Sequence, residues 1–201
     1  MKILVTGFPP FAGATENPSQ ELLGLLASKY TTLLLPNAVR RAPAILMRAV
    51  GRIHPDTVLH LGESRHAKEI IVERGARNLL DTNIPDNDGN SAHNEPVVKD
   101  APAYLSTTIP WRAVQNAIAE AGFPVRNRRD GGTHVSNQVF YWLLQSGRVP
   151  RVGYIHIPPI QHRRGAPGMP LVNLFAAIST ALDVLQRTGS RRLSRPRRSR
   201  R

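Results

Sequence analysis

The sequence predicts an α/β fold in which an open, mostly parallel twisted sheet is covered by helices on both faces. Strand-like apolar runs alternate with helix-like segments along the chain, an order typical of such sheets. Residues 56–63, "DTVLHLGE", are apolar almost throughout, as expected for a strand that is buried on both faces. The chain has 201 residues, 41% of them hydrophobic, which is enough for one domain with its own core.

The first part of the chain supplies strands and helices in alternation. Residues 2–8 form an apolar run that ends at a phenylalanine and two prolines, and a helix is expected at 17–30 because Pro18 lies near its start, where proline is tolerated. The alternation continues with a strand, a helix and a strand at 31–36, 42–55 and 56–63. Residues 69–81 are expected to form an extended pair or a bent strand.

A long polar loop at 84–110 separates the two parts of the predicted fold. It is rich in turn-forming residues, and loops of this length are often functional. Beyond it, apolar periodicity predicts further elements: helices at 111–124, in the later part of 131–147 and at 170–187, and a strand at 151–159.

The net charge of +13 is concentrated at the C-terminal end. Residues 187–201 hold eight arginines and no acidic residue, so an excess of only five positive charges remains for residues 1–186. The Arg/Ser/Pro composition buries too little apolar surface to offset the entropy of ordering, so a disordered basic tail is expected after a domain at 1–186. Its expected partners are polyanions, bound weakly and nonspecifically. Specific nucleic-acid recognition rests on this tail alone and is the least supported function class.

Composition and motif spacing exclude several kinds of site. Because cysteine is absent, there is no disulfide, thiolate metal site or cysteine nucleophile. The first apolar run is far shorter than a signal or membrane-spanning segment, so a cytoplasmic protein without membrane association is expected. The seven histidines lack HExxH spacing, "TGFPPFAG" lacks a phosphate-loop pattern, and "DNDGN" fits no calcium-loop register, so no metal or cofactor is predicted.

Three polar residues lie in apolar or turn-bounded surroundings: Glu73, Ser136 and His156. A carboxylate at the end of a buried strand is costly unless it is paired, so Glu73 and His156 are natural partners. Ser136 lies between a glycine turn and a helix, where it is either a helix cap or a nucleophile at the positive end of that helix. The structural alternatives for the other two are a surface ion pair between Glu73 and Arg74 and a hydrogen-bonded core histidine.

The motifs "TGFPPFAG…NPSQ", "VERGARN…IPDNDGN", "GGTHVSN…FYWLL" and "GYIHIP", in this order, resemble the pyroglutamyl peptidase I (pyrrolidone-carboxylate peptidase) family. The resemblance spans about residues 1–180. It implies a cytoplasmic, generally homo-oligomeric cysteine peptidase that removes N-terminal pyroglutamate (5-oxoproline) from peptides, on an open α/β/α sheet and without a metal or cofactor. By this resemblance Glu73, Ser136 and His156 occupy the positions of the family's Glu, Cys and His triad.

The resemblance also assigns a substrate pocket. Phe8 and Phe11 match residues that pack on the lactam ring, and Asn17 matches an asparagine near that pocket. Ordinary core packing is the alternative for the two phenylalanines. Asn83 stands at the oxyanion position, where the family has an arginine that stabilises the transition state, and residues 62–67 read "GESRHA" where the family has approximately GQAGGR.

These departures imply a pyroglutamyl peptidase with weak or lost activity, because serine replaces the nucleophilic thiol. The alternative is a catalytically diverged relative, either a protein that binds a lactam-type ligand or a serine-dependent hydrolase. An engineered cysteine-to-serine change would look the same at Ser136, but the further departures at 62–67 and Asn83 favour natural divergence.

Overall fold

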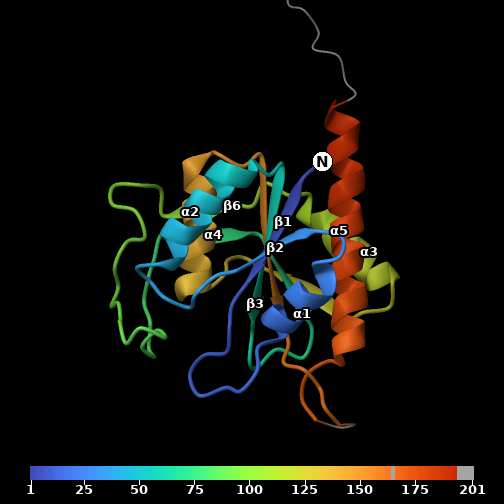
Figure 1. The fold of residues 1–201 in the computed structure, drawn as a ribbon, viewed down its shortest axis with the longest axis horizontal. Coiled ribbons are helices and arrows are strands. Elements are labelled where there is room, and N and C mark those ends of the chain that lie inside the picture. The colour runs from blue at the N-terminus through green and yellow to red at the C-terminus, as the bar shows by residue number, and fades with distance from the viewer. Residues whose placement is uncertain (164–165, 194–201) are drawn as a thin grey trace, which may run out of the picture.

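The computed structural model describes residues 1–163 and 166–193. This part of the chain contains a six-stranded sheet with the strand order β2-β1-β3-β8-β4-β7 (Figure 1). Its strands, in chain order, are β1 (Ile3–Gly7), β2 (Thr31–Leu34), β3 (Thr57–Glu63), β4 (Ile70–Glu73), β7 (Val125–Arg128) and β8 (Arg151–Ile157). Within this sheet, all neighbouring strands pair in parallel except β4 and β8, which are antiparallel. The predicted mostly parallel sheet is therefore confirmed.

Helices cover both faces of the sheet, as predicted (Figure 1). One face packs against α1 (Pro18–Leu26), α3 (Trp111–Glu120) and α5 (Leu171–Leu193). The other face packs against α2 (Ala42–Ile53) and α4 (Val135–Ser146). Successive side chains of a strand alternate between faces, so Tyr154 belongs to the α2/α4 core cluster and Ile155 to the other.

Two short strands were not predicted. The first, β6 (Tyr104–Ser106), lies inside the expected loop at 84–110 and pairs with β5 (Gly75–Arg77) in a separate two-stranded sheet. The second, β7, has the sequence "VRNR" and lies at the edge of the main sheet, where it pairs with β4. An edge strand tolerates charged side chains, so β7 lacks the apolar pattern that identifies a buried strand.

The last helix extends beyond the predicted domain end at residue 186. It continues to Leu193, and the Arg151 guanidinium supports it by donating to the Leu185 carbonyl oxygen at 3.0 Å and to the Thr188 hydroxyl at 3.2 Å. The expectation of disorder from residue 187 is therefore wrong for 187–193. The rest of the predicted tail, 194–201, lies outside the described residues. Within the described residues no helix is long and apolar enough to cross a membrane.

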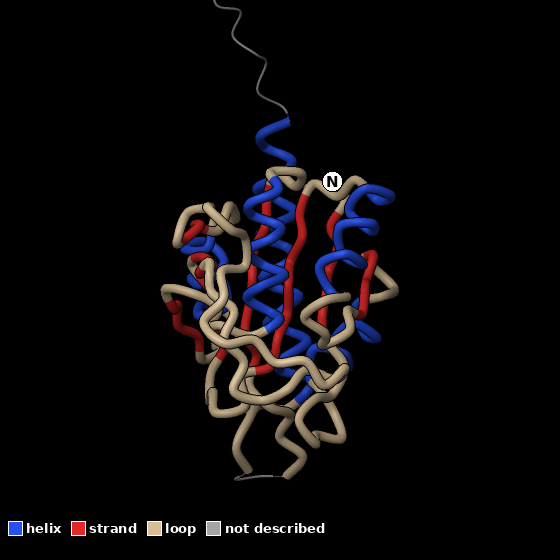
Figure 2. Tube along the Cα trace, turned by 90° about the vertical axis from the view of Figure 1, so that its left-hand side faces the viewer, coloured by secondary structure: helices blue, strands red, loops and turns tan. Residues whose placement is uncertain are grey.

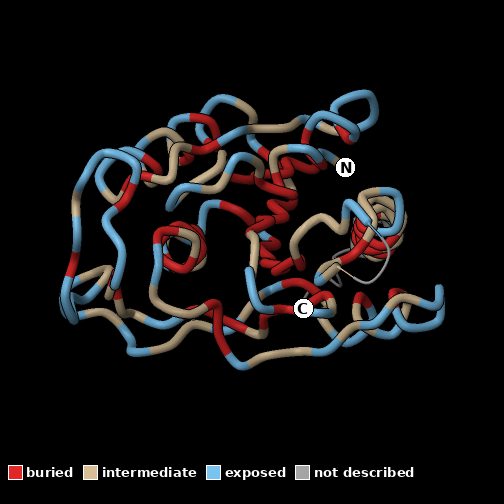
Figure 3. Tube along the Cα trace, turned by 90° about the horizontal axis from the view of Figure 1, so that it is seen from below, coloured by how far each residue is buried: buried red, intermediate tan, exposed pale blue. Residues whose placement is uncertain are grey.

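Long loops gather at one end of the sheet, beyond the carboxyl ends of β1, β3 and β8 (Figure 2). Figure 3 looks onto this end, where exposed loop segments surround buried parts of the chain. Parallel α/β sheets commonly build their sites at this edge, because the loops that follow the strands converge there.

Candidate active site

A pocket lies at this loop-covered edge and collects residues from widely separated parts of the chain. Both Ser136 and His156 line it, as do Phe8, Phe11 and Asn17. The complete lining is Phe8, Phe11, Asn17, Asn37, Gly62, Glu63, Thr82, Ile84, Pro85, Asp86, Gly131, His134, Val135, Ser136 and His156. The fold thus brings most of the predicted site residues to one cavity.

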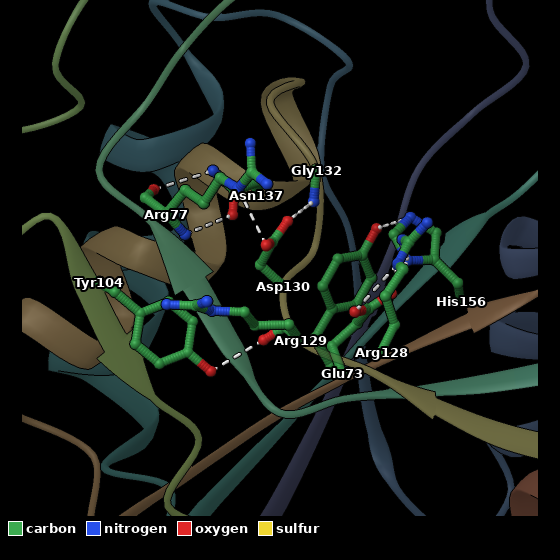
Figure 4. Close-up of polar contacts among 10 residues, drawn as sticks. Glu73, Arg77, Tyr104, Arg128, Arg129, Asp130, Gly132, Asn137 and His156 are labelled. Carbon is green, nitrogen blue, oxygen red and sulfur yellow. Dashed lines mark hydrogen bonds and ion pairs between the residues drawn. The ribbon is translucent and has the colours of Figure 1, made fainter.

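Glu73 and His156 are in direct contact, as the sequence predicted (Figure 4). Glu73 is the last residue of β4 and is fully buried, and its Oε1 lies 2.6 Å from His156 Nδ1. An ionised carboxylate only accepts hydrogen bonds, so the contact places the imidazole proton on Nδ1. The Nε2 atom of His156 is then left as an acceptor, the form that a general base requires.

Arg128 is a partner of Glu73 that sequence reasoning missed. It is the last residue of β7, and its Nη2 lies 2.6 Å from Glu73 Oε1 and 3.0 Å from His156 Nδ1 (Figure 4). The alternative that Glu73 forms a surface ion pair with Arg74 is therefore wrong, because Glu73 is buried and pairs with Arg128 of the neighbouring strand. The pairing of β7 with β4 would have identified Arg128, since it lies directly opposite Glu73 in the register.

His156 is neutral at pH 7 in this environment. Burial lowers its pKa, and the hydrogen bond from Nδ1 to Glu73 opposes that effect without cancelling it. Burial disfavours the charged imidazolium because the protein interior solvates it less well than water does. The site therefore contains a neutral imidazole and a carboxylate, a combination suited to removing a proton from a hydroxyl group.

Ser136 is the second residue of α4, so it is not the helix cap. The N-cap is His134, whose side chain makes no capping hydrogen bond. The first N–H groups of a helix lack intrahelical acceptors and carry its positive dipole end, so Ser136 lies where developing negative charge is stabilised. Within the described chain no hydrogen bond joins Ser136 to His156. The Ser136 hydroxyl is instead a neighbour of the buried Tyr154 hydroxyl: burial raises the pKa of Tyr154, and the polar contact with Ser136 opposes that effect.

Contacts around the preceding turn fix the start of α4. Asn137 accepts from the Arg77 N–H at 3.1 Å and donates to the Arg77 carbonyl oxygen at 3.0 Å, which ties α4 to β5 (Figure 4). Asp130 accepts from the Gly132 N–H at 3.2 Å and forms an ion pair with Arg77. Gly132 has φ +85°, a left-handed conformation that favours glycine. The neighbours of Ser136 therefore hold it in place.

The predicted substrate-binding residues differ in their burial and in the structural contacts that they make. Phe8 is buried and packs edge-on against His60, with ring centroids 4.9 Å apart. Phe11 is partly exposed, and the Arg65 guanidinium lies 4.7 Å above its ring. Asn17 is the N-cap of α1: its Oδ1 accepts from the Ser19 N–H at 2.9 Å. The pocket contribution of Asn17 is thus combined with a capping role.

Asn83 does not reach the pocket. It is exposed, whereas its neighbours Thr82 and Ile84 both line the cavity. Glu63, from the altered loop at 62–67, does line the cavity; burial raises its pKa, and its Oε2 is a buried atom without a hydrogen bond. Among the residues that the structure describes, no group of three or more histidine, aspartate or glutamate side chains could hold a metal ion.

Comparison with known proteins identifies the family of this chain. The family model described as pyroglutamyl peptidase matches residues 1–188. A pyrrolidone-carboxylate peptidase of Treponema denticola is 32% identical over 207 residues, covering 94% of this chain and 95% of the relative. The corresponding protein of Erwinia tasmaniensis is 34% identical over 195 residues, covering 91% and 92%.

Solved structures agree with this result. The pyroglutamyl peptidase I from Bacillus amyloliquefaciens is similar with a TM-score of 0.86 and 30% identity, covering 91% of this chain and 93% of that chain. The pyrrolidone carboxyl peptidase from Thermococcus litoralis is similar with a TM-score of 0.87 and 31% identity, covering 94% and 95%. The similarity therefore extends over nearly the whole fold.

Proposed function

Because the chain belongs to the pyroglutamyl peptidase family, we propose that it hydrolyses the amide bond that follows an N-terminal 5-oxoproline, with Ser136 as the nucleophile. One observation carries this proposal: Ser136 and His156 line the same pocket, and His156 is hydrogen-bonded to the buried Glu73. A hydroxyl, an imidazole and a carboxylate that orients the imidazole form the combination used by serine hydrolases on several unrelated folds.

The pocket suits a small, flat lactam. The two phenylalanines on its wall, Phe8 and Phe11, offer apolar surface for the faces of the 5-oxoproline ring. The ring also has a carbonyl oxygen and an N–H group at its edge, which need polar partners once they leave water. Glu63 supplies a carboxyl group in this cavity whose Oε2 has no partner, so it can accept from the lactam N–H.

In the proposed reaction, the Ser136 oxygen attacks the amide carbon, and the proton of its hydroxyl group ends on the His156 imidazole. Glu73 then stabilises the imidazolium that forms, and the negative oxygen of the tetrahedral intermediate lies by the first N–H groups of α4. The amine leaves with the proton, and water hydrolyses the resulting pyroglutamyl ester. Apart from the substrate and this water, the steps use only side chains and N–H groups of this chain.

We expect turnover to be slow. A serine hydroxyl is neutral until its proton is removed, whereas a thiol at a helix N-terminus is readily ionised. At position 83, where the family has a transition-state arginine, this chain has an exposed asparagine that does not line the cavity. Loss of one transition-state donor typically costs roughly 3 to 4 kcal/mol.

The second candidate function is binding of a lactam-type ligand without turnover. The same two features, Ser136 and the exposed Asn83, favour it, since each removes a contribution to rate and leaves the wall of the cavity intact.

The test is hydrolysis of fluorogenic amides by the purified chain at high enzyme concentration. We expect release from a pyroglutamyl amide, no release from the matching prolyl and glutaminyl amides, and loss of the activity in Ser136→Ala. Binding of 2-pyrrolidone, measured as a thermal shift, without any hydrolysis would favour the second candidate. Hydrolysis that persists in Ser136→Ala would contradict the nucleophile assignment.

A further inference from the structure

Tyr154 is a buried side chain of the site that the sequence did not single out. It precedes His156 by two residues on β8, so both side chains lie on the same face of the sheet. The Tyr154 hydroxyl lies 2.6 Å from His156 Nε2, the nitrogen that a nucleophile would be expected to approach. The opposite strand position, in β4, is Glu73. Tyr154 therefore occupies the centre of the polar cluster.

The hydrogen-bond directions in this cluster follow from the contact with Glu73. His156 donates from Nδ1 to Glu73, so its Nε2 must accept, and the only hydrogen available at 2.6 Å is that of the Tyr154 hydroxyl. Once Tyr154 donates to His156, its oxygen is free to accept from the neighbouring Ser136 hydroxyl. All hydrogens then point the same way, from Ser136 through Tyr154 to His156 and Glu73.

The surrounding chain holds the Tyr154 ring in one position. The ring packs against His60 and Phe140, with centroids 4.9 Å and 5.5 Å away. A Cβ added at Gly62 would collide with the Tyr154 hydroxyl, and one added at Gly131 would come within 2.9 Å of the ring. Since both glycines leave room for this side chain, packing of the ring holds the hydroxyl in the site.

We propose that Tyr154 relays the proton between Ser136 and His156, so that the site is a four-membered chain of Ser136, Tyr154, His156 and Glu73. The inference rests on the proposed function for its substrate. It explains why Ser136 and His156 share the pocket although no hydrogen bond joins them in the described chain. It makes Tyr154 a catalytic residue, because in the proposed relay its oxygen receives the proton of the hydroxyl that reacts.

The relay balances in both directions. As the Ser136 oxygen bonds to the amide carbon, its proton moves to the Tyr154 oxygen, the original Tyr154 proton moves to His156 Nε2, and the carbonyl π electrons move to the carbonyl oxygen. When the intermediate collapses, the carbonyl re-forms and the C–N bond breaks; His156 Nε2 returns a proton to the Tyr154 oxygen, and Tyr154 gives its own proton to the leaving nitrogen, while the Ser136 oxygen stays bonded to the acyl carbon. Burial raises the pKa of Tyr154, which disfavours a free tyrosinate, so we expect the two proton transfers to be concerted.

The test compares the unmodified chain with Tyr154→Phe, which keeps the ring and removes the hydroxyl. The matched control is Tyr141→Phe, another fully buried tyrosine, whose hydroxyl donates to the Pro102 carbonyl oxygen. Hydrolysis of a pyroglutamyl amide gives kcat and KM. Labelling of Ser136 by a fluorophosphonate, followed by intact-protein mass, reports the reactivity of the nucleophile without using the proposed substrate.

We expect Tyr154→Phe to lower kcat and the labelling rate about a hundred-fold while KM stays the same, a loss typical of removing one proton-transfer group. Tyr141→Phe should retain both rates. The labelling rate can also be measured as the fraction of D₂O in the solvent is raised. The dependence for the unmodified chain should fit two protons that move in the transition state, and that for Tyr154→Phe should fit one. A purely structural role of Tyr154 would not change this proton number.

Equal or faster labelling of Tyr154→Phe would overturn the relay, because His156 would then take the Ser136 proton directly. Absence of labelling in the unmodified chain would overturn it too. Labelling that depends on Tyr154, without hydrolysis of pyroglutamyl amides, would support the relay and contradict the proposed substrate. If Tyr154→Phe fails to fold, Gly62→Ala displaces the same hydroxyl and must lower labelling; an unchanged rate would overturn the relay.

Discussion

At the scale of single residues, the fully buried carboxylate of Glu73 is a charge that the fold must compensate. It is fully enclosed and is compensated by two neighbours, the Arg128 guanidinium and the His156 imidazole. A buried charge is tolerated only when such partners remain. If one partner is removed, the remaining buried charge is no longer compensated for the water it lost on folding. Arg128 therefore supports both the stability of the sheet and the orientation of His156.

We predict that Arg128→Gln lowers the free energy of unfolding by about 2 to 3 kcal/mol, because Glu73 keeps its burial and loses its cation. Arg126→Gln is the control: Arg126 lies on the same strand and pairs with Glu69 at 2.7 Å in a largely exposed contact, so its loss should cost at most about 0.5 kcal/mol. Urea denaturation at pH 7 measures both. Equal losses for the two variants would show that burial of Glu73 is not what makes Arg128 important.

The sequence predicted the polar residues that lie in apolar strands, Glu73 and His156. It did not predict Tyr154, because a tyrosine is a common residue in a buried strand. Glu73 and His156 stand out because polar groups in apolar strands need partners. Tyr154 gives no such signal, since a tyrosine in a strand fits simple packing, and only its 2.6 Å contact with His156 reveals it. Asn83 is the opposite case: the motif placed it at the oxyanion position, but it is exposed and does not line the cavity.

At the scale of elements, strands and helices with a strong apolar period were predictable, and weakly patterned edge elements were not. β3 and β8 are buried along their length, so their sequences are apolar almost throughout. β7 is an edge strand with two arginines and β6 has only three residues, so neither shows the pattern of apolar residues that predicts a strand. The missed β7 also concealed Arg128, which is why the cation of Glu73 was misassigned.

The end of α5 gives an element-scale prediction. Thr188 accepts from Arg151 and donates to the Val184 carbonyl oxygen at 2.8 Å, and Gly189 lies against Met1 and Arg151. A chain truncated after residue 193 should therefore keep its melting temperature, whereas truncation after residue 186 should lower stability by roughly 1 to 2 kcal/mol through the lost hydrogen bonds and packing.

Calorimetry of the two truncated chains beside the full-length protein measures this difference. Salt-dependent retention on heparin should fall in both, because arginines are removed in each case. Indistinguishable melting temperatures for the two truncations would mean that residues 187–193 contribute nothing to the fold.

At the scale of the whole molecule, the α2/α4 face of the sheet buries two histidines, His60 and His156, that must stay neutral. Burial lowers the pKa of His60 to about 3, from an ordinary value of 6.5. Between about pH 3 and about pH 6.5 the unfolded chain therefore binds more protons than the folded chain. Stability is fully present above about pH 6.5 and is lost as the pH falls from about 6.5 toward about 3.

We predict that lowering the pH from 7 to 5 reduces the free energy of unfolding by about 2 kcal/mol through His60, with a further contribution of the same sign from His156. In His60→Gln this pH dependence should shrink, whereas in His93→Gln, where an exposed histidine is replaced, it should stay as in the unmodified chain. Urea denaturation at both pH values measures the change. Greater stability at pH 5 than at pH 7 would contradict it.

The whole-molecule arrangement of the site was predictable only in part. Motif order identified the family, and the carboxyl ends of parallel strands located His156 at the correct edge of the sheet. However, β4 runs antiparallel to β8, so Glu73 approaches from the opposite direction and faces Tyr154 in the register. Strand direction depends on long-range pairing, which no local sequence pattern specifies.

The measurement that most directly tests this account is kcat/KM for a pyroglutamyl amide, determined for the unmodified chain and for Ser136→Cys under identical conditions. We expect slow hydrolysis by the unmodified chain and an increase of about tenfold or more in Ser136→Cys, because a thiol at the start of α4 is a stronger nucleophile in the same place. If Ser136→Cys hydrolyses the amide no faster than the unmodified chain, the hydroxyl of Ser136 does not limit the reaction and the account is wrong.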